Sequence, residues 1–238
     1  MATQPILGTV INACFPRSGH RFLREILAQY FKEGFVFYEP YEQSVLSKDK
    51  NKRSINFVNY VKTHDFENLG KAELIDIFPD HRRYLAQYRH PLECITSYYE
   101  FSVEHGHIEQ DTERNWQGFL QEKLAYWQLF ATNWLLAPKE ESLLVDYDKL
   151  YCDPFSCVER VIHFLVGNNS IIDKPLLASI IEKNSFLQYV GDSDSAKTSR
   201  RELASFKYYD AKQFIKIEKK LHRKFLEPCS VRLLLNSA

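Results

Sequence analysis

Three short polar clusters carry the side chains of this chain that could take part in chemistry. They lie at residues 16–21, 62–64 and 89–97, and together they hold arginine, lysine, serine and histidine. Arginine and lysine supply positive charge, serine is a small hydrogen-bond donor, and histidine titrates near neutral pH. These residue types favour a ligand that carries more than one anionic group.

The first cluster joins an apolar run to an amphipathic pattern. Residues 9–15 are apolar and β-branched, which predicts a buried strand, and the apolar residues of 22–31 recur at helical spacing. A strand that turns through Ser18 and Gly19 into a helix directs backbone N–H groups at one point and suits a phosphate, to which Arg17 adds a permanent charge. Taken alone, the cluster is equally typical of a plain strand–helix turn. It is not a Walker A motif, because GxxxxGK[ST] is absent.

The other two clusters also follow predicted strands, at residues 54–61 and 83–88. Ligands of open parallel sheets bind beyond the carboxyl ends of the strands, so we expect the three clusters to converge on one crevice. The second cluster would bring Lys62 and His64 to this crevice. For His64 taken alone, a structural or exposed histidine is an alternative.

The third cluster spans a strand end and the helix after it. Arg89 follows the strand directly, and Pro91 suits the first position of a helix. Ser97 comes eight residues after Arg89, about two turns into that helix. The two side chains could hold a second phosphate, although a surface salt bridge would also explain Arg89.

Strands alternate with helices along the chain, which indicates a mainly parallel α/β sheet flanked by helices. Further predicted elements are helices at 115–136, 154–166 and 210–226, a strand at 142–145, and mostly loop at 182–206. Neither an internal repeat nor a linker is visible, so we expect a single domain over residues 1–238.

The composition is that of a compact globular chain, with 238 residues and 31 Lys and Arg against 31 Asp and Glu. A formal charge of zero argues against a general nucleic-acid or membrane-surface binding role. The first residues lack the basic segment and apolar run of a secretory signal, and no window approaches ~18 apolar residues. The five cysteines are scattered without metal-ligand spacing, so we expect reduced thiols, a cytoplasmic location and no metal.

The clusters, in this order, resemble the sulfotransferases that use 3′-phosphoadenosine 5′-phosphosulfate (PAPS). Residues 15–22 resemble the family's 5′-phosphosulfate loop, Pro-Lys/Arg-Ser/Thr-Gly-x-x-Trp/Phe. Residues 62–64 resemble its Lys-Thr/Ser-His segment, and residues 89–101 resemble its 3′-phosphate segment, with the eight-residue spacing kept. Residues 145–154 resemble its Tyr-Glu-Asp-Leu and Asp-Pro stretch. The likeness covers roughly residues 10–165 and implies a P-loop-kinase-like sulfotransferase fold.

The resemblance implies PAPS as sulfuryl donor, the bisphosphate PAP as product, and in-line transfer without a metal. It makes His64 the general base and gives Lys62 and Arg17 the task of stabilising charge on the sulfonate and the leaving phosphate. Phe22 would either stack on adenine or belong to the helix core. The cofactor-binding residues implied are Arg17, Ser18, Gly19, His20, Arg21, Phe22, Arg89, Ser97, Tyr147, Lys197, Arg200 and Arg201.

The C-terminal part departs from the family pattern. The family closes the cofactor site with Arg-Lys-Gly-x-x-Gly-x-Trp-Lys, whereas the segment that holds Lys197, Arg200 and Arg201 has no glycine, and Glu202 replaces one. Residues 197–224 hold ten Lys and Arg against three Asp and Glu. This local excess indicates either a solvated helix face or steering of a multiply charged donor.

The acceptor site would be built from loops at 35–53, 105–114 and 184–196, whose aromatic and acidic residues favour a polar or cationic small molecule, with a glycan as the reserve. No nucleic-acid or membrane partner is expected. The acceptor's identity, the choice between O- and N-sulfation and the oligomeric state are not predicted. Two alternatives are a nucleotide-dependent small-molecule kinase of related fold, which would need a Walker A motif, and an inactive nucleotide-binding module.

Overall fold

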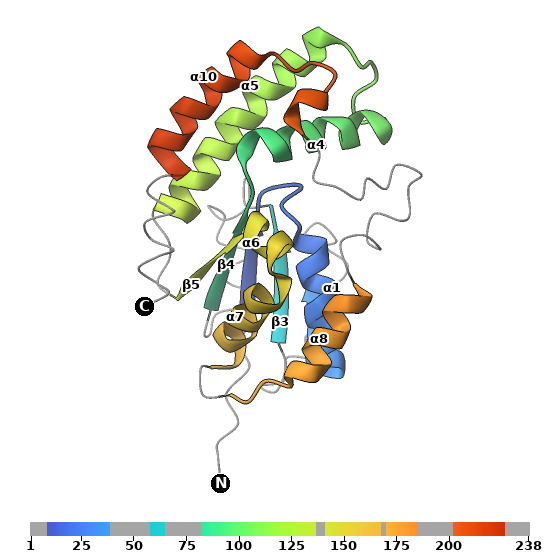
Figure 1. Cartoon of the computed structure of the whole chain (residues 1–238), viewed down its shortest axis with the longest axis vertical. Helices are drawn as coiled ribbons and strands as arrows, with labels where there is room; N and C mark the ends of the chain where they lie inside the picture. The colour runs from blue at the N-terminus through green and yellow to red at the C-terminus, as the bar shows by residue number, and fades with distance from the viewer. Residues whose placement is uncertain are drawn as a thin grey trace. The chain divides into compact units, whose positions relative to one another are not determined.

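The structure is a computed structural model that describes residues 9–38, 58–64, 82–136, 141–167, 170–184 and 202–226. The chain forms two compact units, several of whose elements are labelled in Figure 1. The strand unit comprises Met1–Cys14, Gly19–Tyr88 and Glu140–Thr198. The helical unit comprises Phe15–Ser18, Arg89–Lys139 and Ser199–Ala238.

The strand unit is built on a parallel five-stranded sheet. Its strands are β1 (Thr9–Cys14), β2 (Phe35–Tyr38), β3 (Val58–Thr63), β4 (Arg82–Tyr88) and β5 (Ser142–Asp146), and their spatial order is β2-β3-β1-β4-β5. Its helices are α1 (His20–Phe31), α6 (Tyr147–Cys152), α7 (Pro154–Val166) and α8 (Lys174–Lys183), with a 3-10 turn at Lys32–Gly34. All strand pairs are parallel, which confirms the predicted α/β class.

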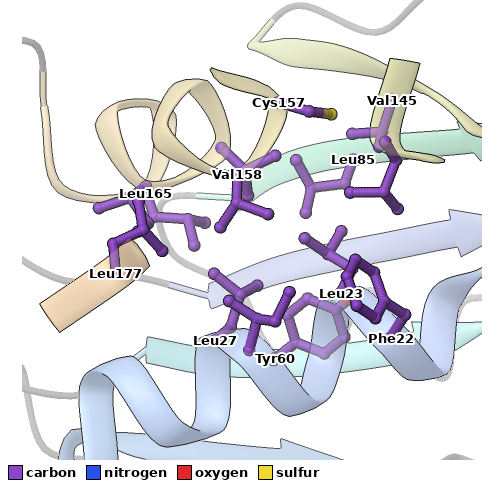
Figure 2. Packing of buried hydrophobic residues seen from close by; sticks show 14 of the residues in the cluster. Phe22, Leu23, Leu27, Tyr60, Leu85, Val145, Cys157, Val158, Leu165 and Leu177 are labelled. Carbon is purple, nitrogen blue, oxygen red and sulfur yellow. The ribbon is translucent and has the colours of Figure 1, made fainter. Parts of the chain in front are cut away.

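One face of the sheet is covered by helices of this unit. Figure 2 shows Leu23 and Leu27 of α1, Val158 of α7 and Leu177 of α8 packed with Tyr60 and Leu85 of the strands. These side chains are fully buried, and each of the leucines and the valine contributes roughly 1.5–3 kcal/mol through removal from water. The alternate strand positions form a second cluster made of strand residues, with Ile11, Tyr38 and Val61 as its buried members.

A buried polar network crosses the middle of the sheet. Asn12 of β1 donates from Nδ2 to the hydroxyl of Tyr60 on β3 and to Oε1 of Gln87 on β4, at 3.2 Å in the second case. All three side chains are fully buried. Burial raises the pKa of the Tyr60 hydroxyl far above its usual range, so it stays protonated.

The helical unit is held together by aromatic packing. Its elements are α4 (Pro91–Glu104), α5 (Glu113–Phe130) with a π-helical extension (Ala131–Leu136), a 3-10 turn (Leu203–Ser205), and α10 (Ala211–Leu221) with a π-helical extension (His222–Leu226). Figure 1 shows α10 alongside α5, where the rings of Trp116 and Phe214 lie 6.4 Å apart and those of Trp127 and Phe225 lie 5.6 Å apart.

Asp111 connects α4, the loop before α5 and the segment before α10. Its carboxylate accepts from Lys207 Nζ at 2.6 Å and from the Tyr99 hydroxyl at 3.2 Å, and its carbonyl accepts from the Tyr208 hydroxyl at 2.7 Å. The hydrogen bond from Lys207 is the main reason that the pKa of Asp111 lies below its usual range, and the hydrogen bond from the Tyr99 hydroxyl to the carboxylate acts in the same direction.

Most predicted elements are present, with a few corrections. The helix predicted at 154–166 has those bounds, and the helix predicted at 115–136 begins earlier, at Glu113, because Thr112 caps it by accepting from Asn115 N at 3.3 Å. The loop predicted at 182–206 lies largely outside the described residues. The single-domain assignment stays a prediction.

Apart from short 3-10 turns, three elements of the described residues were not predicted. Residues 35–38, assigned to an acceptor loop, form the edge strand β2, whose rings at Phe35 and Phe37 lie 5.4 and 6.2 Å from that of Tyr60. These two aromatic side chains therefore pack on the sheet. The others are α6 and α8, which are capped by Asp146 and Asp173. None of the helices in the described part of the chain combines the length and apolar character of a membrane span.

Candidate active site

The sheet topology makes the three predicted clusters follow neighbouring strands. β1 lies at the centre, with β3 on one side and β4 on the other. Ala13 pairs with Thr63, and Cys14 pairs with Gln87, so the three carboxyl ends are level. The strand order changes direction at β1, which is the position where open α/β sheets bind ligands. The convergence of all three clusters on one crevice stays a prediction.

In the strand unit, the backbone of β1 fixes the imidazole of His64. Its Nδ1 lies 2.9 Å from the Cys14 carbonyl oxygen. A carbonyl oxygen can only accept, so Nδ1 carries the hydrogen, and the lone pair of the neutral ring lies on Nε2. The buried Cys14 thiol donates to the Thr63 carbonyl at 3.4 Å, and its sulfur lies 3.6 Å from His64 Nδ1.

Two further predicted residues are near His64, His20 through a ring contact and Lys62 two positions earlier in the chain. His20 is the first residue of α1, and its ring meets the His64 ring edge to face, with centroids 5.4 Å apart at 84°. Lys62 belongs to β3 itself and is only 7% exposed. The strand predicted from the sequence ended at residue 61, whereas β3 continues to Thr63. Lys62 therefore lies within the sheet and not in a loop after the strand.

Gly19 forms the turn between β1 and α1. Its φ is +82°, in the left-handed region that favours glycine, and it is the N-cap of α1. A Cβ added to it would lie 2.9 Å from Cδ2 of Tyr147, closer than side chains tolerate. The sequence-predicted residue Tyr147 therefore packs directly on the predicted phosphate turn, and this position requires glycine.

Phe22 of α1 packs in the core of the strand unit. It is 2% exposed and belongs to the core cluster with Leu150. This packing favours the core alternative over stacking on adenine. Its neighbour Arg21 is exposed on α1.

In the helical unit, Arg17 contacts two residues of α4. Its backbone has a φ of +67°, and its Nε donates to Ser97 Oγ at 3.2 Å. Its guanidinium carbon lies 5.0 Å from the centroid of the Phe101 ring. Ser18 is buried, and its hydroxyl donates to the Phe15 carbonyl. The structure thus brings together two predicted anion-binding side chains, Arg17 and Ser97.

Arg89 is held at the start of α4. Its Nε lies 3.1 Å from Glu93 Oε2, and the two side chains are 12% and 10% exposed. Its Nη1 donates to the Arg17 carbonyl at 3.5 Å. Glu93 was missed as a partner of Arg89, although the i, i+4 spacing on a helix is the signal that could have found it.

Three predicted cofactor residues, Lys197, Arg200 and Arg201, lie outside the described residues. Of the predicted acceptor loops, 105–114 is described. An open pocket of about 450 Å³ lies there, with His107, Glu109, Arg114, Phe119 and Glu122 among its lining residues. The Phe101 ring, which contacts Arg17, has its centroid 6.0 Å from that of His107.

These features define a class of protein. A parallel sheet with a left-handed glycine turn after its central strand, and with basic side chains following neighbouring strands, is the P-loop-like arrangement of enzymes that act on phosphorylated nucleotides. Each unit by itself offers groups that suit phosphate oxygens: the two guanidinium groups and Ser97 in the helical unit, and the helix N-terminus at Gly19 in the strand unit.

The chain belongs to the sulfotransferase domain family, which matches residues 8–224. It is similar in structure to mouse sulfotransferase SULT7A1 complexed with PAP, at 15% identity and a TM-score of 0.69, over 100% of this chain and 95% of that one. It is also similar to the sulfotransferase domain of the Synechococcus PCC 7002 olefin synthase, at 16% identity and a TM-score of 0.51, over 92% and 95%. A comparison with curated proteins finds no match.

Family membership identifies the chain as a sulfotransferase enzyme. It thereby decides between the sequence-based alternatives, because a small-molecule kinase and an inactive module were both compatible with a nucleotide-binding sheet. The likeness to the two solved structures confirms the predicted fold.

Proposed function

We propose that the chain transfers a sulfuryl group from PAPS to a hydroxyl or amine of a small polar acceptor, without a metal, and that His64 is the general base. The contact of 2.9 Å between His64 Nδ1 and the Cys14 carbonyl carries the proposal. It leaves the lone pair on Nε2, which is the atom that would take the acceptor's proton.

In the proposed step the acceptor oxygen or nitrogen attacks sulfur, and its proton passes to His64 Nε2. The bond between sulfur and the bridging oxygen of the 5′-phosphate breaks, and PAP leaves with that electron pair. Negative charge grows on the leaving oxygen and remains on the sulfonate, where Lys62 and Arg17 stabilise it. As in phosphoryl transfer, most of the rate comes from positioning and charge neutralisation.

The two phosphates of the donor are assigned to different residues. The backbone from Ser18 to Arg21 holds the 5′-phosphate, and the left-handed turn at Gly19 supports this assignment. Arg89 and Ser97 hold the 3′-phosphate. The mouse sulfotransferase of similar fold was solved with PAP, which supports PAP as the product.

The pocket in the 105–114 loop supports a small acceptor. Its volume of about 450 Å³ suits a molecule of metabolite size. Its lining includes two acids, Glu109 and Glu122, against one arginine, Arg114, so polar or cationic molecules would find partners there. We assign the acceptor class, not the individual acceptor, on this basis.

Two measurements test the proposed function. A thermal-shift comparison of PAP with ATP plus Mg²⁺ should give stabilisation by PAP, because ligand that binds only the folded state raises its melting temperature. A transfer assay with PAPS and a panel of small phenols, alcohols and amines should release PAP. Stabilisation by ATP plus Mg²⁺ alone, or no PAP release with any acceptor, would argue against the proposal.

We further propose that the chain is one functional domain and works in the cytoplasm. A single family matches residues 8–224, which supports one functional domain. The cysteines at 14, 94, 152 and 157 form no disulfide bonds in the part of the chain that the structure describes, which supports a reducing compartment such as the cytoplasm.

A further inference from the structure

Helix α10 carries a concentrated positive charge in a chain with no net charge. Residues 211–224 contain six Lys and Arg and one acid, Glu218. Four of the basic residues recur at spacings of four, three and four along the helix and so share one face. We call Lys212, Lys216, Lys219 and Arg223 the basic stripe; all four are exposed.

The basic stripe lies on the solvent face of α10. The opposite face packs in the helical unit through Phe214 and Leu221, which are 2% and 1% exposed. The apolar face of α10 is thus buried within the helical unit, and the exposed face is the one that carries the basic stripe. Its charge is directed outward into solvent.

One side of α10 contacts the start of α4. Glu218 Oε1 lies 3.5 Å from His90 Nε2, and His90 is the N-cap of α4, next to Arg89. The helix diameter of about 10–12 Å therefore separates the basic stripe from the neighbourhood of Arg89. This is close to the Debye length of about 8–10 Å at moderate salt and well within the ~30 Å that applies at 0.01 M.

We propose that the basic stripe of α10 is an electrostatic capture surface for the anionic nucleotide, which speeds its arrival at Arg89 and Arg17 without contacting it in the bound state. The inference rests on the proposed function, since it takes PAPS and PAP as the ligands. Two phosphate groups give PAP about three to four negative charges. Positive potential over a surface of this kind raises association rates by roughly 10- to 1,000-fold at low salt.

The test measures association and dissociation rates of a fluorescent PAP derivative by stopped flow. The triple variant Lys216→Glu, Lys219→Glu, Arg223→Glu should lower the association rate constant about 10-fold or more at 10 mM salt. The dissociation rate constant should stay unchanged. At 1 M salt, where the Debye length is about 3 Å, the variant and the unmodified protein should associate at equal rates.

Two control variants separate steering from other causes. Lys32→Glu, Lys174→Glu, Lys183→Glu makes the same change in net charge on exposed positions of the strand unit and should leave the association rate nearly unchanged. Lys216→Arg, Lys219→Arg, Arg223→Lys keeps the charge and should behave like the unmodified protein. A fluorescent AMP derivative, with one phosphate fewer, should respond less to the first triple variant than the PAP derivative does.

The outcomes distinguish this inference from the proposed function. If the unmodified protein does not bind the PAP derivative, both are wrong. If it binds the derivative but the first triple variant associates as fast as the unmodified protein at 10 mM salt, only the capture surface is wrong. An equal slowing in the strand-unit control, or an effect confined to dissociation, would also overturn it.

Discussion

His64 in the strand unit and Arg17 with Arg89 in the helical unit are held by different kinds of contact. His64 is fixed by a backbone carbonyl at 2.9 Å, beside a thiol that is itself bonded to the backbone of β3. Arg17 is held by the Ser97 hydroxyl and the Phe101 ring, and Arg89 by the Glu93 carboxylate. In the strand unit, the contacts of His64 Nδ1 come from the backbone and thiol of Cys14 in β1. In the helical unit, the partners described for the two arginines are mainly side chains, with one longer contact of 3.5 Å from Arg89 Nη1 to the Arg17 carbonyl.

The difference corresponds to the tasks proposed for the two regions. A general base must present one nitrogen in one tautomer, and a carbonyl of a central strand cannot rotate away from it. A side chain that binds an arriving anion must exchange one partner for another, and side-chain contacts are easily replaced. The rigidly placed His64 therefore suits proton transfer, and Arg17 and Arg89, whose contacts can be exchanged, suit anion binding.

The largest expected effect breaks the first side of this comparison. His64→Asn keeps a donor near the Cys14 carbonyl but removes the basic nitrogen, so the turnover number should fall about 100- to 10,000-fold. The dissociation constant of PAP should change little, because His64 is not assigned to a phosphate. Steady-state kinetics measures the turnover number, and calorimetry measures the dissociation constant of PAP. Turnover within a few-fold of the unmodified enzyme would show that His64 is not the base.

A smaller loss should follow from breaking the second side. Arg89→Ala should weaken PAP by about 10- to 150-fold, since a hydrogen bond between charged groups contributes roughly 1.5–3 kcal/mol. AMP, which lacks the 3′-phosphate, should bind almost as before. Combining the change with Glu93→Gln removes the carboxylate that had faced the guanidinium and controls for its burial. Equal weakening of AMP and PAP would contradict the placement of that phosphate.

Two left-handed glycines allow a matched test of local strain, one in each unit. Ala at Gly19 or at Gly106 should cost about 1–2 kcal/mol, because φ is +82° and +70°. Only Gly19 has a neighbour in the way, Tyr147, whereas a Cβ at Gly106 meets nothing within 4 Å. Gly19→Ala should therefore lower the free energy of unfolding by about 1–3 kcal/mol more than Gly106→Ala. Urea titration measures both, and equal values would show that the ring of Tyr147 moves freely.

The smallest expected effect concerns Asp111. Its pKa is lowered in the folded protein, so its stabilising contribution is complete above the usual carboxyl pKa and is lost as the pH falls through the folded value. Asp111→Asn should lower the melting temperature by a few degrees at most at pH 7, since Lys207 and Asp111 are 58% and 36% exposed. The difference between the two melting temperatures should be largest at pH 7 and should shrink as the pH is lowered below the usual carboxyl pKa of about 3.9. A difference that stays constant with pH would point to packing instead.

Local patterns in the sequence predicted the central strands and most helices because those elements are bounded by prolines and polar clusters. β2 was missed because a four-residue apolar run becomes a strand only by pairing with β3, whose position is remote in sequence. The unpredicted α8 did carry a local signal, Asp173 followed by Lys174 and Pro175, which is typical of a helix start.

The site residues could also be predicted from local sequence, but most of their contacts could not. Arg17, His64 and Arg89 could be chosen from their positions after predicted strands. The contact of His64 with Cys14 joins residues 50 apart and depends on the parallel pairing of β1 with β3. Contacts of that kind need the three-dimensional fold, whereas the partnership of Arg89 with Glu93 is local and was available from helical spacing.

The buried Asn12 amide has a consequence for the register of the sheet. A slip by one residue destabilises an apolar strand only where it moves buried side chains into solvent. In β3 such a slip would also take the Tyr60 hydroxyl away from Asn12 and turn Lys62 to the opposite face of the sheet. A buried amide that loses its partners costs about 1–3 kcal/mol. The hydrogen bonds among Asn12, Tyr60 and Gln87 therefore favour one register of the central strands. In this register Lys62 and His64 keep their positions relative to β1.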